Sequence, residues 1–170
     1  MLLVVALVRP QQVLAFHLPT IALLLVSPFA GFACILLEYL IGVLLLFLRT
    51  RKLVTSVAVH SIYSTVSRIG IKDIFSVLAL VVGEELILRQ LLYKLLATDF
   101  AMALWSVISL CTAAYAINHL AFGISSVISK LASGLLYVLL FYVSGMSIGV
   151  VIVAHATQNL VLLFLSRARS

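Results

Sequence analysis

The sequence predicts an all-α protein: a polytopic bundle of about five or six transmembrane helices, with one further helix along the membrane surface. Of its 170 residues, 65% are hydrophobic and only 9% are charged. A soluble domain is typically about 45–50% apolar and about 25% charged. A small soluble fold exposes too much surface to hide so many apolar side chains, so lipid must surround most of them.

The apolar residues also fall into runs of the length that a helix needs to cross the hydrocarbon core, about 20 residues. The predicted spans are residues 29–48, 74–97, 101–120, 125–143 and 146–165. Residues 1–26 are also apolar but are interrupted by Arg9, Pro10 and Pro19. That segment is either one kinked span or an interfacial piece followed by a re-entrant one. No basic region or small-residue cleavage site marks it as a signal peptide, so we expect it to be retained.

Residues 53–70 mix apolar side chains with hydroxyl groups, which favours a helix lying along the interface. Basic residues flank this segment, so the positive-inside tendency places it in the cytoplasm. Counting the spans forward puts the tail with Arg167 and Arg169 on the same side, so the C-terminus is expected to be cytoplasmic. No soluble domain or repeat interrupts the chain, which is expected to form one membrane domain over residues 1–170.

The net charge of +6 has a topological explanation. On a soluble protein it would point towards nucleic acid, but here the basic residues lie between the apolar runs and act as orientation signals. We therefore expect the lipid bilayer as a partner and no nucleic acid.

Three charged residues lie near the middle of the run at 74–97. They are Glu84, Glu85 and Arg89, and each costs about 2.5–3.5 kcal/mol at a helix centre. Glu85 and Arg89 are four residues apart with the acid first, which is the favourable order for an ion pair on a helix. Glu84 points about 100° away, so the same arginine cannot easily pair with both. A carboxylate left in a partly dehydrated site is suited to take a proton from water.

Two other spans carry polar pairs at the same spacing. Tyr115 precedes His119 by four residues, and His155 precedes Asn159 by four. Polar stripes in membrane helices face the bundle interior, so the simplest packing brings the three stripes together. A carboxylate, two imidazoles and a carboxamide would then share one pocket, a set that can activate water and stabilise an oxyanion.

The remaining polar residues in the spans have simpler explanations. Glu38 has no obvious partner and either lines the same cavity or forms a structural pair. Lys130 is near enough to a helix end to extend towards the interface. Tyr137 fits packing or an interfacial belt, and Asn118 falls on a different face from His119 and remains ambiguous.

Taken together, these motifs resemble those of the CAAX protease and bacteriocin-processing family (CPBP, or ABI) of glutamic intramembrane endopeptidases. The family pattern is Glu-Glu-x-x-x-Arg, then Phe-x-x-x-His, then His-x-x-x-Asn. This sequence has Glu84-Glu85-Leu-Ile-Leu-Arg89, Tyr115-Ala-Ile-Asn-His119 and His155-Ala-Thr-Gln-Asn159 in the same order. The resemblance covers residues 74–165, the expected catalytic core, and departs from the pattern in having Tyr115 instead of Phe.

The resemblance implies an intramembrane endopeptidase of a peptide or protein substrate, without a cofactor or metal. Glu84 would activate the attacking water with help from His119, while His155 and Asn159 would stabilise the oxyanion. Arg89 would hold Glu85 and fix the geometry. Small bacterial members are linked to bacteriocin maturation or self-immunity, which implies a multi-pass protein of a bacterial inner membrane and a membrane-associated, C-terminally tagged or prenylated type of substrate.

Three alternatives remain open from the sequence. A non-catalytic immunity or scaffold protein would bind a partner through the same polar pocket. A proton-coupled transporter would use intramembrane Glu and His as a relay, although no inverted repeat is present. A zinc enzyme would use one Glu and two His as ligands, although the short His-Glu-x-x-His helix is absent.

Overall fold

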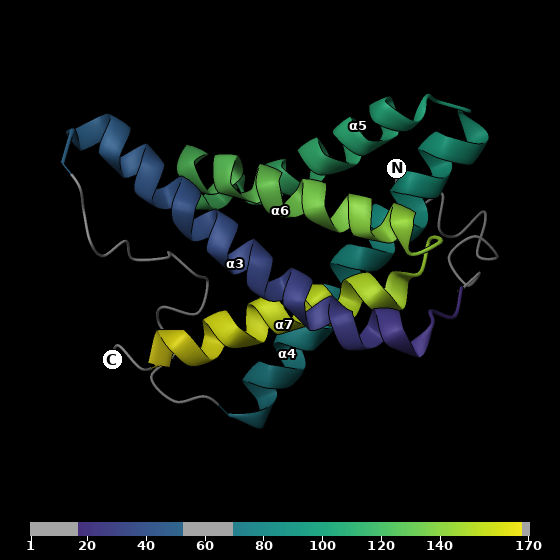
Figure 1. Ribbon diagram of the computed structural model, residues 1–170, viewed down its shortest axis with the longest axis horizontal. Helices are drawn as coiled ribbons and strands as arrows, with labels where there is room; N and C mark the ends of the chain where they lie inside the picture. The colour runs from purple at the N-terminus through teal and green to yellow at the C-terminus, as the bar shows by residue number, and fades with distance from the viewer. Residues whose placement is uncertain (1–16, 53–69, 168–170) are drawn as a thin grey trace.

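The computed structural model describes residues 17–52 and 70–167, and every regular element in that part of the chain is a helix (Figure 1). The predicted all-α fold class is therefore confirmed. The elements are α3 (Ile21–Thr50), α4 (Ile71–Glu85), the π-helices η1 (Leu86–Tyr93) and η2 (Leu95–Asp99), α5 (Leu104–Ile117), the 3₁₀ turn η3 (Leu120–Phe122), α6 (Ile124–Val143) and α7 (Ile148–Arg167).

Three of the helices, α3, α6 and α7, are long and apolar enough to cross a membrane. Large apolar side chains remain exposed along their surfaces, Phe29 and Leu135 among them, as expected where lipid is the solvent. The predicted span at 74–97 falls on α4, η1 and η2, which follow one another with α and then π winding. The predicted span at 101–120 contains α5, which at 14 residues is shorter than expected.

Helix α3 begins at Ile21, eight residues before the predicted span at 29–48. Pro28 lies inside the helix and does not interrupt it. Proline has no N–H to bond the carbonyl of residue 24. The hydroxyl of Ser27 donates to that carbonyl instead, at 2.8 Å. Membrane helices tolerate proline when a neighbouring hydroxyl satisfies the freed group in this way. Residues 21–26 are thus the first turns of α3, and not a separate segment. The predicted interfacial helix at 53–70 and residues 1–16 lie outside the described residues, except for Gly70.

Two glycines set the closest helix contacts. Helix α3 packs against α7 and α6, α5 against α6, and α4 against α7. A Cβ atom on Gly31 would lie 2.3 Å from the carbonyl oxygen of Ala154 in α7. A Cβ atom on Gly134 would lie 2.8 Å from the Tyr115 ring of α5. Small residues at helix crossings let membrane helices approach closely.

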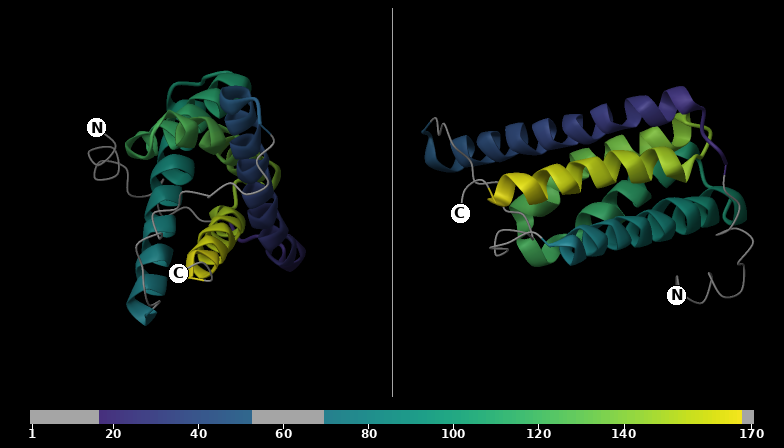
Figure 2. Two further views of the ribbon diagram at one scale, coloured as in Figure 1. Left: turned by 90° about the vertical axis from the view of Figure 1, so that its left-hand side faces the viewer. Right: turned by 90° about the horizontal axis from the view of Figure 1, so that it is seen from below.

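The helices alternate in direction across the molecule. In the right-hand view of Figure 2, α3 and α7 end on the side where α4 begins. The same view places the segment after η2 and the start of α7 at the opposite end. Glu84 and Glu85, where α4 passes into η1, lie between these two ends, whereas Tyr115 lies near the end of α5.

Candidate active site

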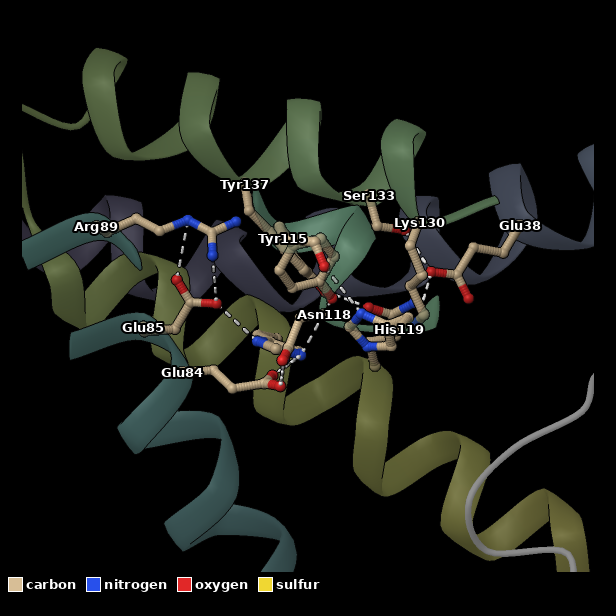
Figure 3. A network of polar contacts seen from close by, with 12 residues as sticks. Glu38, Glu84, Glu85, Arg89, Tyr115, Asn118, His119, Lys130, Ser133 and Tyr137 are labelled. Carbon is tan, nitrogen blue, oxygen red and sulfur yellow. Dashed lines mark hydrogen bonds and ion pairs between the residues drawn. The ribbon is translucent and has the colours of Figure 1, made fainter. Parts of the chain in front are cut away.

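Polar side chains of the first two motifs gather inside the bundle, as Figure 3 shows for the residues it labels, and hydrogen bonds add His155 of the third motif. Glu84 and Glu85 are the last two residues of α4, and Arg89 follows in η1. Tyr115 lies near the end of α5, and His155 lies in the middle of α7. These residues come from segments far apart in sequence, and the hydrogen bonds below connect them directly.

Glu85 is the fully buried centre of the network. Its carboxylate is within 3.2 Å of both Nε and Nη1 of Arg89, which confirms the predicted ion pair. His155 Nδ1 lies 2.7 Å from Glu85 Oε1. Glu85 and Arg89 are both completely inaccessible, and buried charges persist only when they are paired and hydrogen-bonded. Glu85 is therefore committed to holding Arg89 and His155 in place.

Glu84 has a different environment although it is the next residue. Its side chain keeps 15% of its accessible surface. Oε1 accepts a 2.9 Å hydrogen bond from the Asn118 amide. Oε2 lies 3.8 Å from Nε2 of His155, too far for a hydrogen bond. This carboxylate has no arginine partner among the described residues, and it is the one that remains reachable.

The second histidine lies in the turn just after α5 and is held by the last turn of that helix. His119 Nδ1 lies 3.0 Å from the backbone carbonyl oxygen of Tyr115. Because that oxygen can only accept, Nδ1 carries the hydrogen atom and donates the hydrogen bond. In the neutral ring, Nε2 is then the nitrogen with a lone pair. The side chain is almost buried and its ring lies 5.0 Å from that of Tyr115. His119 therefore presents a fixed tautomer.

Asn159 stands apart from this network. It is half-buried within α7, and its side chain is not hydrogen-bonded to another residue in the described part of the chain. It lies one helical turn beyond His155 on α7, as the sequence predicts. Among the predicted site residues, Glu85 contacts both Arg89 and His155, and Glu84 lies 3.8 Å from His155. His119 is bonded to the Tyr115 carbonyl, and Asn159 is in none of these contacts.

The structure also shows the partners of four residues whose contacts the sequence left ambiguous or predicted differently: Asn118, Tyr137, Lys130 and Glu38. Asn118 contacts Glu84, as described above. Tyr137 is completely buried and donates to Gln158 Oε1. Lys130 does not extend to the interface, because its Nζ lies 2.7 Å from Glu38 Oε1. Ser133 also donates to that oxygen at 2.5 Å. The sequence held no signal for these contacts, because each joins residues on different helices.

Two tyrosine rings surround the guanidinium group of Arg89. Its central carbon lies 4.9 Å from the Tyr115 ring centroid and 5.7 Å from that of Tyr137. Aromatic faces attract a cation, more strongly when water is excluded. The rings therefore help to keep the Glu85–Arg89 pair inside the bundle. Within the described residues, no group of three or more His, Cys, Asp or Glu side chains has an arrangement that could hold a metal ion.

Comparison with known proteins agrees with this arrangement. No curated protein and no solved structure matches the chain. A family model described as "Type II CAAX prenyl endopeptidase Rce1-like" matches residues 71–161, from the start of α4 to the residue two beyond Asn159. The match covers more than half of the sequence and includes all three motifs. The resemblance to the CAAX protease family is thus confirmed: the chain is an integral membrane protein that belongs to the Rce1-like family of CAAX-type intramembrane proteases.

Proposed function

We propose that this protein is an intramembrane endopeptidase in which Glu84 activates a water molecule to hydrolyse a peptide bond. The observation that carries the proposal is the contrast between two neighbouring carboxylates. Glu85 is fully buried and occupied by Arg89 and His155, whereas Glu84 stays partly exposed beside them. Two carboxylates in environments this different are suited to different roles, one structural and one as the base.

In the proposed reaction, Glu84 takes a proton from water while the water oxygen attacks the carbonyl carbon of the substrate. The C–N bond of the resulting tetrahedral intermediate then breaks, and the amine leaves with the proton that Glu84 held. Asn118 supports Glu84 by donating to its Oε1 at 2.9 Å, which fixes the direction of Oε2. A correctly placed general base contributes typically about 10²–10⁴-fold in rate.

We propose that the histidines divide the remaining work. The lone pair on Nε2 of His119 is available to a water molecule, because Nδ1 already donates to the Tyr115 carbonyl. Nε2 of His155 faces Glu84 and the Tyr115 hydroxyl and, when it carries a proton, can donate to the oxyanion. Asn159, one turn along α7, would be the second donor. Removing one such donor costs typically about 10²–10³ in rate.

The family description is that of a type II CAAX prenyl endopeptidase. For this chain we propose a membrane-associated substrate of that type, a C-terminally tagged or prenylated protein. A lipid-modified C-terminus concentrates at the bilayer, next to a site that lies within a bundle surrounded by lipid.

The first test compares protein termini in host membranes that contain the wild-type protein or Glu84→Gln at equal levels. The substitution keeps the shape of the side chain and removes the base. We expect a set of new termini in the wild type to fall by about 100-fold or more in the variant. Asp73→Asn is the matched control: it makes the same change in an exposed carboxylate at the start of the same helix, where Asp73 only caps Gly70.

The outcomes separate the candidate functions. Termini that disappear in Glu84→Gln and remain in Asp73→Asn would support proteolysis and identify the substrate. Identical termini in all three samples, with each protein folded and present in the membrane, would contradict the proposal and favour an immunity or scaffold role.

A further inference from the structure

The hydroxyl group of Tyr115 lies at the centre of the site without a role so far. The side chain is completely buried between α5, α6 and α7. Its ring contacts Arg89, Tyr137 and both site histidines. The ring alone would fill this space, as the Phe of the family motif would. The hydroxyl adds one polar atom, and that atom lies 3.4 Å from Nε2 of His155.

The rest of the His155 ring is already held. Nδ1 donates to Glu85 Oε1 at 2.7 Å, because a carboxylate paired with a guanidinium group acts as the acceptor. One face lies against the Tyr137 ring, with centroids 4.9 Å apart and planes inclined by 31°. The charged groups that contact His155 or its partners are Glu84, Glu85 and Arg89. Only Nε2 remains for chemistry.

Two groups compete for Nε2. The Tyr115 hydroxyl lies at 3.4 Å and Glu84 Oε2 at 3.8 Å, so only the hydroxyl is within hydrogen-bonding reach. A phenol both donates and accepts. It can therefore donate to Nε2 when that atom is unprotonated and accept from it when the ring is cationic. Without the hydroxyl, the nearest partner of Nε2 would be the carboxylate of Glu84.

We propose that the Tyr115 hydroxyl is a positioning group that holds Nε2 of His155 away from Glu84 and thereby keeps the base free for water. A direct contact between a protonated Nε2 and Glu84 would turn the carboxylate away from the substrate. The hydroxyl occupies Nε2 in the resting site and yields it to the oxyanion during the reaction. This inference rests on the proposed role of Glu84.

The test uses Tyr115→Phe, which removes one oxygen and keeps the packed ring. Tyr93→Phe is the matched control, because it removes the hydroxyl of another fully buried tyrosine, whose ring packs edge-on against Phe141 and has no place in the site. Both variants are assayed in detergent with an internally quenched peptide that ends in a farnesylated cysteine and three further residues. We expect kcat to fall about 3- to 10-fold in Tyr115→Phe with KM unchanged, the size of one hydrogen bond. Tyr93→Phe should stay within about twofold of wild type.

A second readout does not depend on cleavage. The chain has four histidines, so selective ¹⁵N-histidine labelling gives few signals, and a His155→Gln variant assigns that of His155. We expect the His155 Nε2 resonance to move in Tyr115→Phe and to stay unchanged in Tyr93→Phe. An unchanged His155 resonance together with wild-type kcat in Tyr115→Phe would overturn the inference. Activity in Glu84→Gln would instead overturn the proposed function, whatever the result for Tyr115.

Discussion

At the scale of single residues, the site depends on two identical side chains that the helix points in different directions. Successive residues of a helix are rotated by about 100°. That rotation puts Glu85 into the core against Arg89 and His155, and it leaves Glu84 at the edge with 15% of its surface accessible. The buried pair stabilises the geometry, and the partly exposed carboxylate keeps its reactivity.

Asn118 is predicted to orient the base. In Asn118→Ala the hydrogen bond to Glu84 Oε1 is lost, so the carboxylate can rotate away from its productive position. We expect kcat for the farnesylated peptide to fall about tenfold, the lower end for a hydrogen bond to a charged group, because this one is exposed. Asn118→Asp should be worse, since it places a like charge against Glu84.

Ser129→Ala is the comparison for this prediction. Ser129 is exposed on α6, and its hydroxyl bonds only to the Ser125 carbonyl of its own helix. The activity of the Ser129→Ala variant should equal that of wild type. Equal activity of Asn118→Ala and Ser129→Ala would show that Asn118 merely ends α5 and does not orient Glu84.

The sequence predicted the contacts within one helix and the approach of the first and third motifs, but it missed the individual pairs that other residues form between helices. The spacing of Glu85 and Arg89 was enough to predict their ion pair, because helical geometry alone brings them together. Asn118 is 34 positions from Glu84, and Glu38 is 95 positions from Ser133. Such pairs depend on how the helices cross, which no local pattern encodes.

At the scale of elements, the segment 71–99 changes its winding at the site. Glu85 is the last residue of α4, and Arg89 lies in the π-helical η1, so the ion pair bridges the change. Short π-helical stretches occur often at functional sites. The apolar run predicted a helix here, but not the change in winding, because apolar periodicity does not distinguish α from π geometry over a few residues.

The crossing of α3 and α7 should be sensitive to a single methyl group. In Gly31→Ala the new Cβ would meet the Ala154 carbonyl at 2.3 Å, and backbone cannot move aside as a flexible side chain can. We expect a loss of about 1–3 kcal/mol in unfolding free energy, the usual cost of overpacking. Thermal unfolding in detergent measures it.

Gly83→Ala makes the same change where a Cβ atom would meet nothing within 4 Å. Alanine is favoured over glycine inside a helix by about 1 kcal/mol. That variant should therefore be as stable as wild type or more so. If Gly31→Ala proved as stable as Gly83→Ala, the close approach of α3 to α7 would not be a requirement of the fold.

At the scale of the whole molecule, helix directions and basic residues give one orientation. Helices α3 and α7 end on the side where α4 begins, as Figure 2 shows. Arg49, Arg51, Lys52 and Lys72 are at that end of the bundle and are exposed. The far end, around Phe100, has no comparable basic cluster in the described residues. The positive-inside tendency then predicts that the basic end faces the cytoplasm.

Cysteine labelling tests this orientation directly. The two native cysteines, Cys34 and Cys111, are buried and can be replaced by alanine to give a cysteine-free background. Phe100→Cys and Lys52→Cys then place one exposed thiol at each end. In intact bacterial cells, a membrane-impermeant maleimide should label Phe100→Cys, and it should label Lys52→Cys only after the membrane is opened. The reverse pattern would invert the orientation. Labelling of both thiols in intact cells would mean that the segment from Ile71 to Asp99 does not cross the membrane. Glu84 would then lie outside the membrane interior, which would contradict the proposed intramembrane mechanism.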